Sequence, residues 1–346
     1  MANKTARLGD LATYINGYAF KPADWGETGL PIIRIQDLTG NSYQLNRYDG
    51  EYPERIEVND GDVLISWSAS LGVYVWQRGK ALLNQHIFKV VFDKLPVNKD
   101  YFVFAVEHKL AEMESKTHGA TMKHIVKKDF DGTTIPYPPI EKQAEIADHL
   151  RRITSLIDRQ TEQLLLLDQL VKSRFIELFG DPETNPKGWT RQRLDQICEN
   201  LDSRRVPITS TNRKAGNYPY YGASGIVDYV KDYIFDEDIL LISEDGANLV
   251  MRSTPIAFSV SGKVWVNNHA HVVRFESKAT QKYIEICFAL TDISGSITGT
   301  AQPKLNQAKL NAMMFCVPPI ELQEQFAAFV EQTDKSKLCS KMEVAA

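Results

Sequence analysis

The 346-residue sequence predicts an α+β protein with two tandem β-rich domains in a pseudo-two-fold arrangement, separated by long helices that pair as an antiparallel coiled coil. Two observations predict this architecture. Short motifs of the first half return in the same order in the second half, and residues 140–179 carry a helical apolar repeat without glycine or proline. A period of about 180 residues is too long for a solenoid, whose repeats run roughly 20–50 residues, so the repeated unit is a whole domain.

The repeated motifs lie 176 to 183 residues apart, and the differences in spacing indicate loop insertions. The matched pairs are Pro138-Pro139-Ile140-Glu141-x-Gln143 with Pro318-Pro319-Ile320-Glu321-x-Gln323, Gly119-Ala120-Thr121 with Gly299-Thr300-Ala301, Asn84-Gln85-His86 with Asn267-Asn268-His269, and Asp62-Val63-Leu64-Ile65 with Asp238-Ile239-Leu240-Leu241. We therefore expect a first domain at 1–138, a central helix at 139–180, a second domain at 181–317 and a C-terminal helix at 318–346.

Within each domain, short runs of β-branched and aromatic residues alternate with turn residues, a pattern typical of strands. A helix follows the strands in each domain, because apolar residues recur there at spacings of three and four. The expected strands are 30–35, 62–67 and 87–92 in the first domain and 238–243, 256–260 and 271–275 in the second; the expected helices are 101–114 and 281–291.

The central segment predicts one helix on the order of 55–60 Å long, since each residue adds ~1.5 Å. Its apolar residues keep a spacing of 3.5 over more than four heptads, which indicates a coiled-coil seam rather than an ordinary surface helix. The expected seam residues are Ile146, Leu150, Ile153, Ile157, Leu164, Leu167, Val171 and Leu178, with Phe326 and Val330 on the second helix. The sequence from Lys335 onward loses the heptad rhythm, so we expect the second helix to be too short for full pairing.

The composition is ordinary for globular protein, with 43% hydrophobic and 24% charged residues. The net charge of −4 does not suggest a nonspecific nucleic-acid binder, although basic residues cluster at 116–128 and 204–214. Such clusters are more often solvated faces than phosphate sites. The four cysteines form no CxxC pair, and no apolar run approaches a membrane span, so we expect a cytoplasmic protein without membrane contact.

Several catalytic motifs are missing. The proline pairs lack the preceding Asn or Asp of an amino-methyltransferase motif, and no phosphate loop or GxSxG elbow is present. The pair His269 and His271 could suggest a metal site, but only one histidine, His86, lies at the matching motif of the first domain, so packed or hydrogen-bonded histidines are expected rather than metal ligands. We predict no catalytic residue, no metal site and no cofactor in this chain.

Taken together, the motifs resemble those of specificity subunits of type I restriction–modification systems over almost the whole length. Each motif is weak alone, but their order and duplication make the resemblance specific. The residues that carry it are Leu8-Gly9-Asp10-Leu11, the segment from Gly29 to Leu38, the segment from Tyr218 to Ile226, Asn267-Asn268-His269-Ala270-His271-Val272, and both Pro-Pro-Ile-Glu-x-Gln motifs.

The resemblance implies two target-recognition domains, each reading one half of a bipartite double-stranded DNA target. It implies that the helices space these domains and dock two modification (methyltransferase) subunits, which would hold S-adenosylmethionine. Restriction subunits using ATP and Mg would join the complex.

Base edges are read by hydrogen bonds, whereas lysine and arginine on phosphates mainly set register. Candidate DNA contacts are therefore the polar residues of loops that match between the domains, with two arginines as phosphate contacts. They are Ser66, Ser68, Lys123, His124, Arg204, Arg205, Tyr221, Ser224, Asp245, Asn248, Gln302, Lys304 and Asn306. The alternative for each residue is that it simply builds a turn.

Two other interpretations of the chain stay open: a duplicated protein-interaction scaffold without DNA specificity, which the acidic net charge favours slightly, and a truncated allele that assembles poorly. The base preference and the spacer length depend on loop geometry and DNA deformability, so no motif encodes them.

Overall fold

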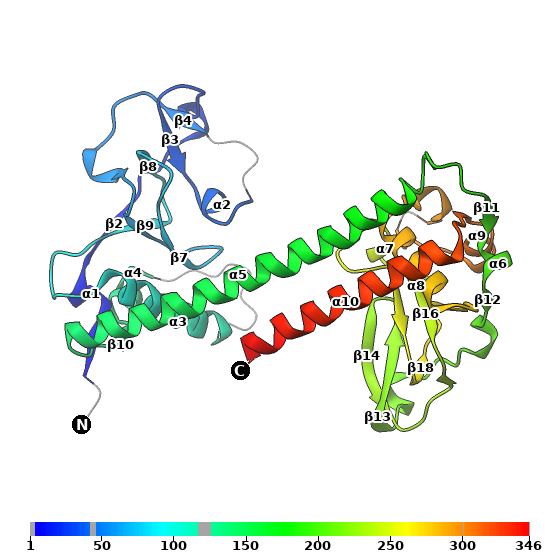
Figure 1. Ribbon diagram of the computed structural model, residues 1–346. Helices are drawn as coiled ribbons and strands as arrows, with labels where there is room; N and C mark the ends of the chain where they lie inside the picture. Colours follow the sequence, from blue (N-terminus) through cyan, green and yellow to red (C-terminus); the bar gives the residue numbers. More distant parts are fainter. Residues whose placement is uncertain (1–3, 42–45, 117–125, 300, 346) are drawn as a thin grey trace. The chain divides into compact units, whose positions relative to one another are not determined.

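The computed structural model describes residues 4–41, 46–116, 126–299 and 301–345. The chain divides into two compact units, Met1–Leu156 (unit one) and Ile157–Ala346 (unit two). The boundary falls inside helix α5 (Ile140–Phe179), which begins in unit one and ends in unit two (Figure 1). The two units therefore share the central helix.

Unit one contains two four-stranded sheets and one separate strand pair. The first sheet has the order β2 (Thr13–Asn16), β9 (Ile87–Val91), β6 (Val63–Ser66), β7 (Gly72–Val75), and is antiparallel throughout. The second sheet has the order β4 (Arg47–Tyr48), β3 (Leu30–Ile33), β8 (Ala81–Leu83), β5 (Glu57–Val58), with β3 and β8 parallel. The strand pair is β1 (Thr5–Arg7) with β10 (Thr134–Pro136), and the helices are α1 (Leu8–Leu11), α2 (Ile35–Leu38), α3 (Lys99–Lys116) and α4 (Lys127–Gly132), with 3₁₀ turns at Pro22–Asp24 and Glu54–Ile56.

Unit two repeats this topology strand for strand. Its first sheet has the order β12 (Glu199–Asn200), β19 (Ala270–Arg274), β16 (Ile239–Ser243), β17 (Ala257–Val260). Its second has the order β14 (Gly225–Val230), β13 (Ala215–Gly222), β18 (Lys263–Val266), β15 (Phe235–Asp236), again with one parallel pair, β13 and β18. The remaining elements are the pair β11 (Arg191–Arg193) with β20 (Met314–Cys316), helices α6 (Leu194–Ile197), α7 (Asn248–Met251), α8 (Lys278–Leu290), α9 (Gln307–Asn311) and α10 (Ile320–Ala345), and 3₁₀ turns at Asp202–Arg204, Ser210–Asn212 and Ser294–Ser296.

The repeated Pro-Pro-Ile-Glu-x-Gln motif starts both long helices by the same local contact. The carbonyl of the first proline in each pair precedes the helix and lies outside its hydrogen-bond ladder, so it needs another donor. In each motif the glutamine side chain turns back: Nε2 of Gln143 donates to the Pro138 carbonyl at 2.8 Å, and Nε2 of Gln323 donates to the Pro318 carbonyl at 2.7 Å. Both glutamines are buried, so the motif is a structural start signal, and the predicted helix starts are confirmed.

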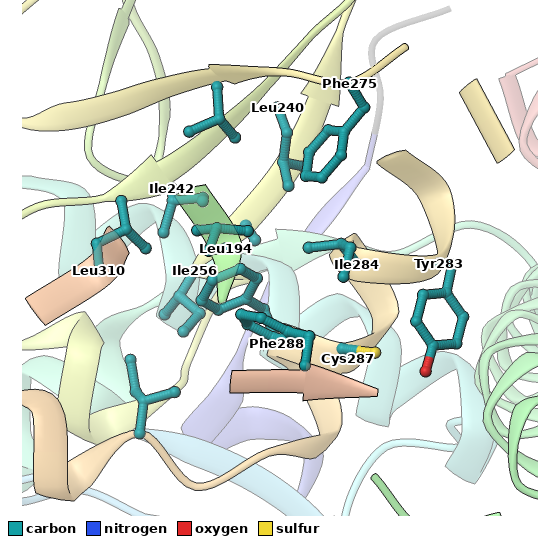
Figure 2. Close-up of a cluster of buried hydrophobic side chains, with 14 of the residues drawn as sticks. Leu194, Leu240, Ile242, Ile256, Phe275, Tyr283, Ile284, Cys287, Phe288 and Leu310 are labelled. Atoms are coloured by element: carbon teal, nitrogen blue, oxygen red, sulfur yellow. The ribbon is translucent and has the colours of Figure 1, made fainter. Parts of the chain in front are cut away.

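The central strand of each first sheet is covered on both faces. Successive side chains of a strand point to opposite faces. In unit two, Leu240 and Ile242 of β16 pack into one apolar cluster with helix α8 (Figure 2). Ile239 and Leu241 pack into another cluster with the second sheet. All residues of β6 and β16 are accordingly buried, and each unit has its own core.

The C-terminal half of α5 packs against α10, which runs antiparallel to it in unit two (Figure 1). An aromatic cluster holds the contact: the Phe175 ring stacks on Tyr283 at 5.2 Å and meets Phe326 edge-on at 5.5 Å. Further along, Nζ of Lys337 lies 2.8 Å from an oxygen of Asp168. This pairing agrees with the predicted antiparallel helices.

The predicted seam is only partly packed. Among its residues, Val171, Phe326 and Val330 are buried, and the half-buried ones are Ile146, Leu150, Leu164, Leu167 and Leu178. Ile153 and Ile157 stay 53% and 45% exposed, which agrees with a second helix too short for full pairing, and their role in an interface stays a prediction. An apolar repeat identifies the face of a helix, but it does not say how far the partner helix reaches.

The structure corrects the expectation that the heptad rhythm is lost at the C-terminus. Helix α10 continues to Ala345, and its inward positions keep spacings of three and four up to Ser340. After the buried Gln323, these positions change from apolar to polar along the helix: Phe326 and Val330 are followed by Thr333, Lys337 and Ser340. Hydrophobicity alone misses such a seam because threonine and serine fit it without contributing an apolar signal. The helix spans 26 residues against 40 for α5.

Candidate nucleic-acid interface

Four loops of unit two meet at one end of its first sheet. We call residues 221–225, 243–248, 267–269 and 301–306 the reading cluster of unit two. The backbone N–H of Glu244 donates to the His269 carbonyl at 2.9 Å, and that of Leu305 donates to the Glu244 carbonyl at 2.8 Å. The Ser243 hydroxyl donates to the carbonyl of Ala223, which fixes the β13–β14 turn to strand β16. Segments far apart in sequence thus form one surface.

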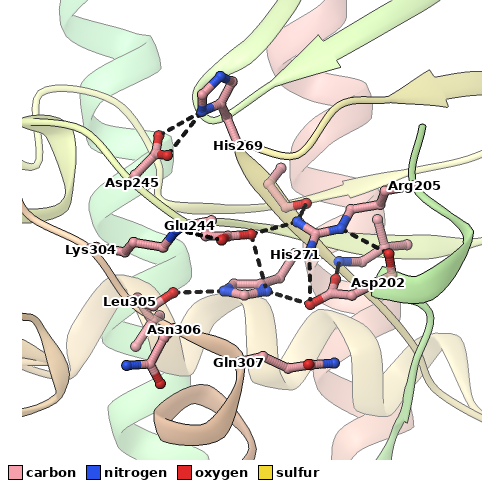
Figure 3. A network of polar contacts seen from close by, with 12 residues as sticks. Asp202, Arg205, Glu244, Asp245, His269, His271, Lys304, Leu305, Asn306 and Gln307 are labelled. Atoms are coloured by element: carbon pink, nitrogen blue, oxygen red, sulfur yellow. Dashed lines mark hydrogen bonds and ion pairs between the residues drawn. The ribbon is translucent and has the colours of Figure 1, made fainter. Parts of the chain in front are cut away.

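A buried ionic network supports this cluster (Figure 3). The fully buried His271 has both ring nitrogens at acceptors: Nδ1 lies 2.6 Å from Asp202 and Nε2 lies 2.7 Å from the Leu305 carbonyl. Arg205 donates to Glu244 at 2.6 Å and to the Ala270 carbonyl at 2.8 Å. The prediction of a hydrogen-bonded histidine here is confirmed.

Burial and pairing act in opposite directions on the carboxyl groups of this network. Burial alone would raise the pKa of Asp202, but hydrogen bonds from His271 and the Val272 N–H, with the charge of Arg205, lower it below its usual value. The pKa of Glu244 is lowered in the same way, burial being outweighed by Arg205, His271 and Lys304. Both groups are thus held as carboxylates.

Because both pKa values are lower in the folded state, unit two should lose stability as the pH falls. As the pH falls, these carboxyl groups bind protons in the unfolded chain before they do so in the folded chain, near the usual Asp and Glu pKa values of about 3.9 and 4.3. The stabilisation is complete above these values and is lost as the pH falls toward the folded-state pKa values. Urea unfolding from pH 7 to pH 3 measures the effect, and Asp202→Asn should reduce the acid-dependent part. A stability that rises on acidification would contradict this.

Unit one has different side chains at the strand position that matches His271 of unit two. Phe88 faces Ile65 across β9 and β6, as His271 faces Ile242 across β19 and β16. The Trp67 N–H donates to the His86 carbonyl at 3.2 Å, as Glu244 does to His269. Here the Trp67 ring stacks on Phe88 at 5.6 Å where unit two has its ion pairs. The frame is shared, and the side chains differ.

Part of the predicted set of DNA contacts lies on these loops. In unit two, Ser224 occupies the exposed β13–β14 turn, Gln302 is exposed, and Lys304 forms an antiparallel bridge with Asp245. Tyr221 is half-buried at the end of β13, and in unit one Ser68 is half-buried just after β6. Lys123 and His124 lie outside the described residues.

Other members of that set serve the fold instead. Ser66 is fully buried and donates to the Ser70 carbonyl, and Arg205 is only 13% exposed inside the ionic network. Asn306 caps helix α9 by accepting from the Lys309 N–H, and Asn248 accepts from the Thr254 N–H. These four side chains are engaged within the fold, and their assignment as DNA contacts stays a prediction. Residues that build turns and residues that read bases are of the same polar types, so residue type alone does not separate them.

Arg204 also has an internal partner, although its side chain stays 44% exposed. Its guanidinium lies over the Phe235 ring at 4.6 Å and pairs with Glu237 at 2.7 Å.

Among the described residues no cluster of three or more histidine, cysteine, aspartate or glutamate side chains is placed to hold a metal ion. The described helices also include none long and apolar enough to cross a bilayer.

The duplicated fold matches one protein family. A family model described as "type I restriction modification DNA specificity domain" matches residues 2–167 and again residues 186–342. The chain therefore belongs to this family and carries two such domains in tandem, which confirms the resemblance noted in its sequence.

Named relatives agree with this assignment. A putative type I restriction enzyme specificity subunit of Haemophilus influenzae is 32% identical over 138 residues, covering 40% of this chain and 35% of the relative. The EcoBI specificity subunit of Escherichia coli is 29% identical, covering 48% and 35%. These two matches span about a third of each relative. The MjaVIII specificity subunit of Methanocaldococcus jannaschii is 23% identical but covers 96% and 86%.

A solved structure has the same fold. The crystal structure of a type I restriction–modification S subunit from M. genitalium superposes with a TM-score of 0.62 at 14% identity, covering 99% of this chain and 92% of that one. The predicted fold class, two β-rich domains with long helices, is confirmed.

Proposed function

We propose that this chain is the DNA-reading specificity subunit of a type I restriction–modification complex. Each unit reads one half of a bipartite double-stranded DNA target, and helices α5 and α10 set the spacing of the halves and dock two methyltransferase subunits. The observation that carries this proposal is the pair of matching loop regions, one at the end of the first sheet in each unit. They have the same strand topology, but ion pairs lie beneath one and an aromatic stack beneath the other.

The chain itself is non-catalytic in this proposal. Adenine methylation and DNA cleavage belong to other subunits, with S-adenosylmethionine on the methyltransferases and with ATP and Mg on the restriction subunits. The family assignment and the missing catalytic motifs support this division of labour. The two half-sites should differ in sequence, because the residues at matched positions differ in charge and size.

The test is to express the chain with its neighbouring methyltransferase gene and to map adenine methylation across the host genome. A split motif, methylated in both halves, is the expected result. An assembled complex that methylates no such motif would favour the protein-interaction scaffold. Failure to assemble would favour an allele weakened by the short helix α10.

Lengthening α5 tests the spacing role. Duplicating residues 150–156 inserts seven residues before the α10 contact and keeps the helical face, adding ~10.5 Å of helix. The preferred DNA spacer should then grow by about three base pairs, at ~3.4 Å each. Methylation mapping measures this change. A seven-residue Gly-Ser insertion at the same place should broaden the spacer preference instead, and an unchanged spacer with the helical insertion would contradict the role.

A further inference from the structure

In each unit a short turn connects the second sheet to the first, with an amide residue at its tip. Gln85 lies between β8 and β9, and Asn268 lies between β18 and β19. The residue before each amide is held by a similar backbone hydrogen bond. Asn84 N–H donates to the Ile33 carbonyl at 3.1 Å, as Asn267 N–H does to the Tyr221 carbonyl at 3.0 Å. These tips are equivalent points of the two units.

The two asparagines that open these turns are used by the fold. Oδ1 of Asn84 accepts from the Gln85 N–H at 2.9 Å, and Oδ1 of Asn267 accepts from the His269 N–H at 2.8 Å. The residue that follows each asparagine, Gln85 or Asn268, has an exposed side chain. Within the part of the chain that the structure describes, neither side-chain amide makes a hydrogen bond to another residue. Their donors and acceptors are available to a ligand.

Backbone strain marks the same place in unit one. His86, next to Gln85, has φ of 72°, and Ala69 in the loop after β6 has φ of 60°. Left-handed backbone is unfavourable for residues other than glycine, and it persists only where surrounding contacts impose it. Here the His86 carbonyl accepts from the Trp67 N–H. The fold thus holds the Gln85 turn in a conformation that its residues do not prefer.

In unit two the side chains around Asn268 are also held in place. Nδ1 of His269 lies 2.9 Å from the Asp245 carboxylate, and Asp245 bridges to Lys304 through the backbone. The Lys304 side chain pairs with Glu244 at 3.1 Å and stays 50% exposed, so a cation suited to a phosphate lies on the same loop cluster.

We propose that Gln85 and Asn268 are equivalent base-reading residues, each recognising an adenine in its own half-site; this proposal rests on the function proposed above. A carboxamide both accepts and donates, and it therefore complements the N6 amino group and the N7 atom of adenine in the major groove. The glutamine has one more methylene than the asparagine, so the two tips differ in reach. Neither residue was among the contacts predicted from sequence, although both lie in a motif noted there as a repeat.

The experiment uses the full complex with its methyltransferase subunits and the split motif of the wild type. Competition binding is measured with duplexes in which each base pair of that motif is replaced in turn. Gln85→Ala should relax one A·T position in one half by roughly 5- to 150-fold and leave the other half unchanged. Asn268→Ala should do the same in the other half. Gln85→Glu should shift the preference there from adenine toward cytosine, whose N4 group donates to a carboxylate.

The controls are Gln77→Ala and Asn217→Ala, which remove exposed amides at the opposite ends of the same sheets. They should leave every base preference unchanged. Equal loss of affinity for all duplexes in Gln85→Ala and Asn268→Ala would indicate phosphate contacts and overturn the proposal, as would unchanged preferences. A wild-type complex without any split motif would instead contradict the proposed function itself.

Discussion

Replacing Asp202 with alanine should destabilise unit two by about 3–5 kcal/mol, because it removes one partner from a buried ionic network. The carboxylate accepts from Nδ1 of His271 at 2.6 Å and from the Val272 N–H at 2.8 Å, and it lies 3.3 Å from Arg205. Without it, a buried imidazole, a backbone N–H and a guanidinium all lose an acceptor. The loss of stability then reflects the groups left unpaired rather than the strength of any one bond.

Equilibrium unfolding in urea measures the total change, and hydrogen–deuterium exchange locates it. The amides of β16 and β19 should exchange faster, while those of β6 and β9 in unit one should not change. The matched control is Asp195→Ala, which breaks an exposed pair with Arg193 and should have little effect. Equal effects of the two substitutions would contradict a structural role for the buried network.

The second large effect is expected from Phe175→Ala, which should cost unit two about 3–5 kcal/mol. Phe175 is fully buried, and its ring contacts Phe179 at 4.9 Å, Tyr283 at 5.2 Å and Phe326 at 5.5 Å. Three aromatic rings around it leave little room for collapse, so a cavity remains at the contact between α5 and α10. Exchange of the α10 amides should rise most.

The control on the same helix is Leu170→Ala, where the side chain is 49% exposed. It should change stability by no more than about 0.5 kcal/mol. If Leu170→Ala were as damaging as Phe175→Ala, the packed face of α5 would have to differ from the one described here. Phe175→Ala should also weaken assembly with the methyltransferase subunits if, as proposed, the helix pair docks them.

The helix starts and the duplication could be predicted because their signals are local. A proline pair followed by a glutamine satisfies its own backbone within five residues, so the same letters build the same helix start twice. The strand predictions succeeded for a related reason. Unbroken apolar runs such as Ile239–Ser243 correspond to strands buried on both faces.

The extent of the helix pairing could not be predicted in this way. Ile153 and Ile157 carry the apolar repeat, yet they remain exposed, while the polar Thr333 and Ser340 are buried. Whether a side chain is covered depends on where another segment ends, and that segment is more than 160 residues away in the sequence. Phe175 and Phe179 were missed as seam residues because the contact with Tyr283 of α8 enlarges the packed face.

The loops of the candidate DNA interface show most clearly what the sequence determined and what the folded chain decided. Sequence alone was sufficient for the family and the two tandem domains, since these follow from repeated motifs and periodicity. Only the folded chain separated Arg205 and Asn306, which are bound internally, from Gln85 and Asn268, whose amides are exposed. The physical reason is that a polar side chain becomes structural or available according to the partners that distant segments bring to it, and residue type does not encode those partners.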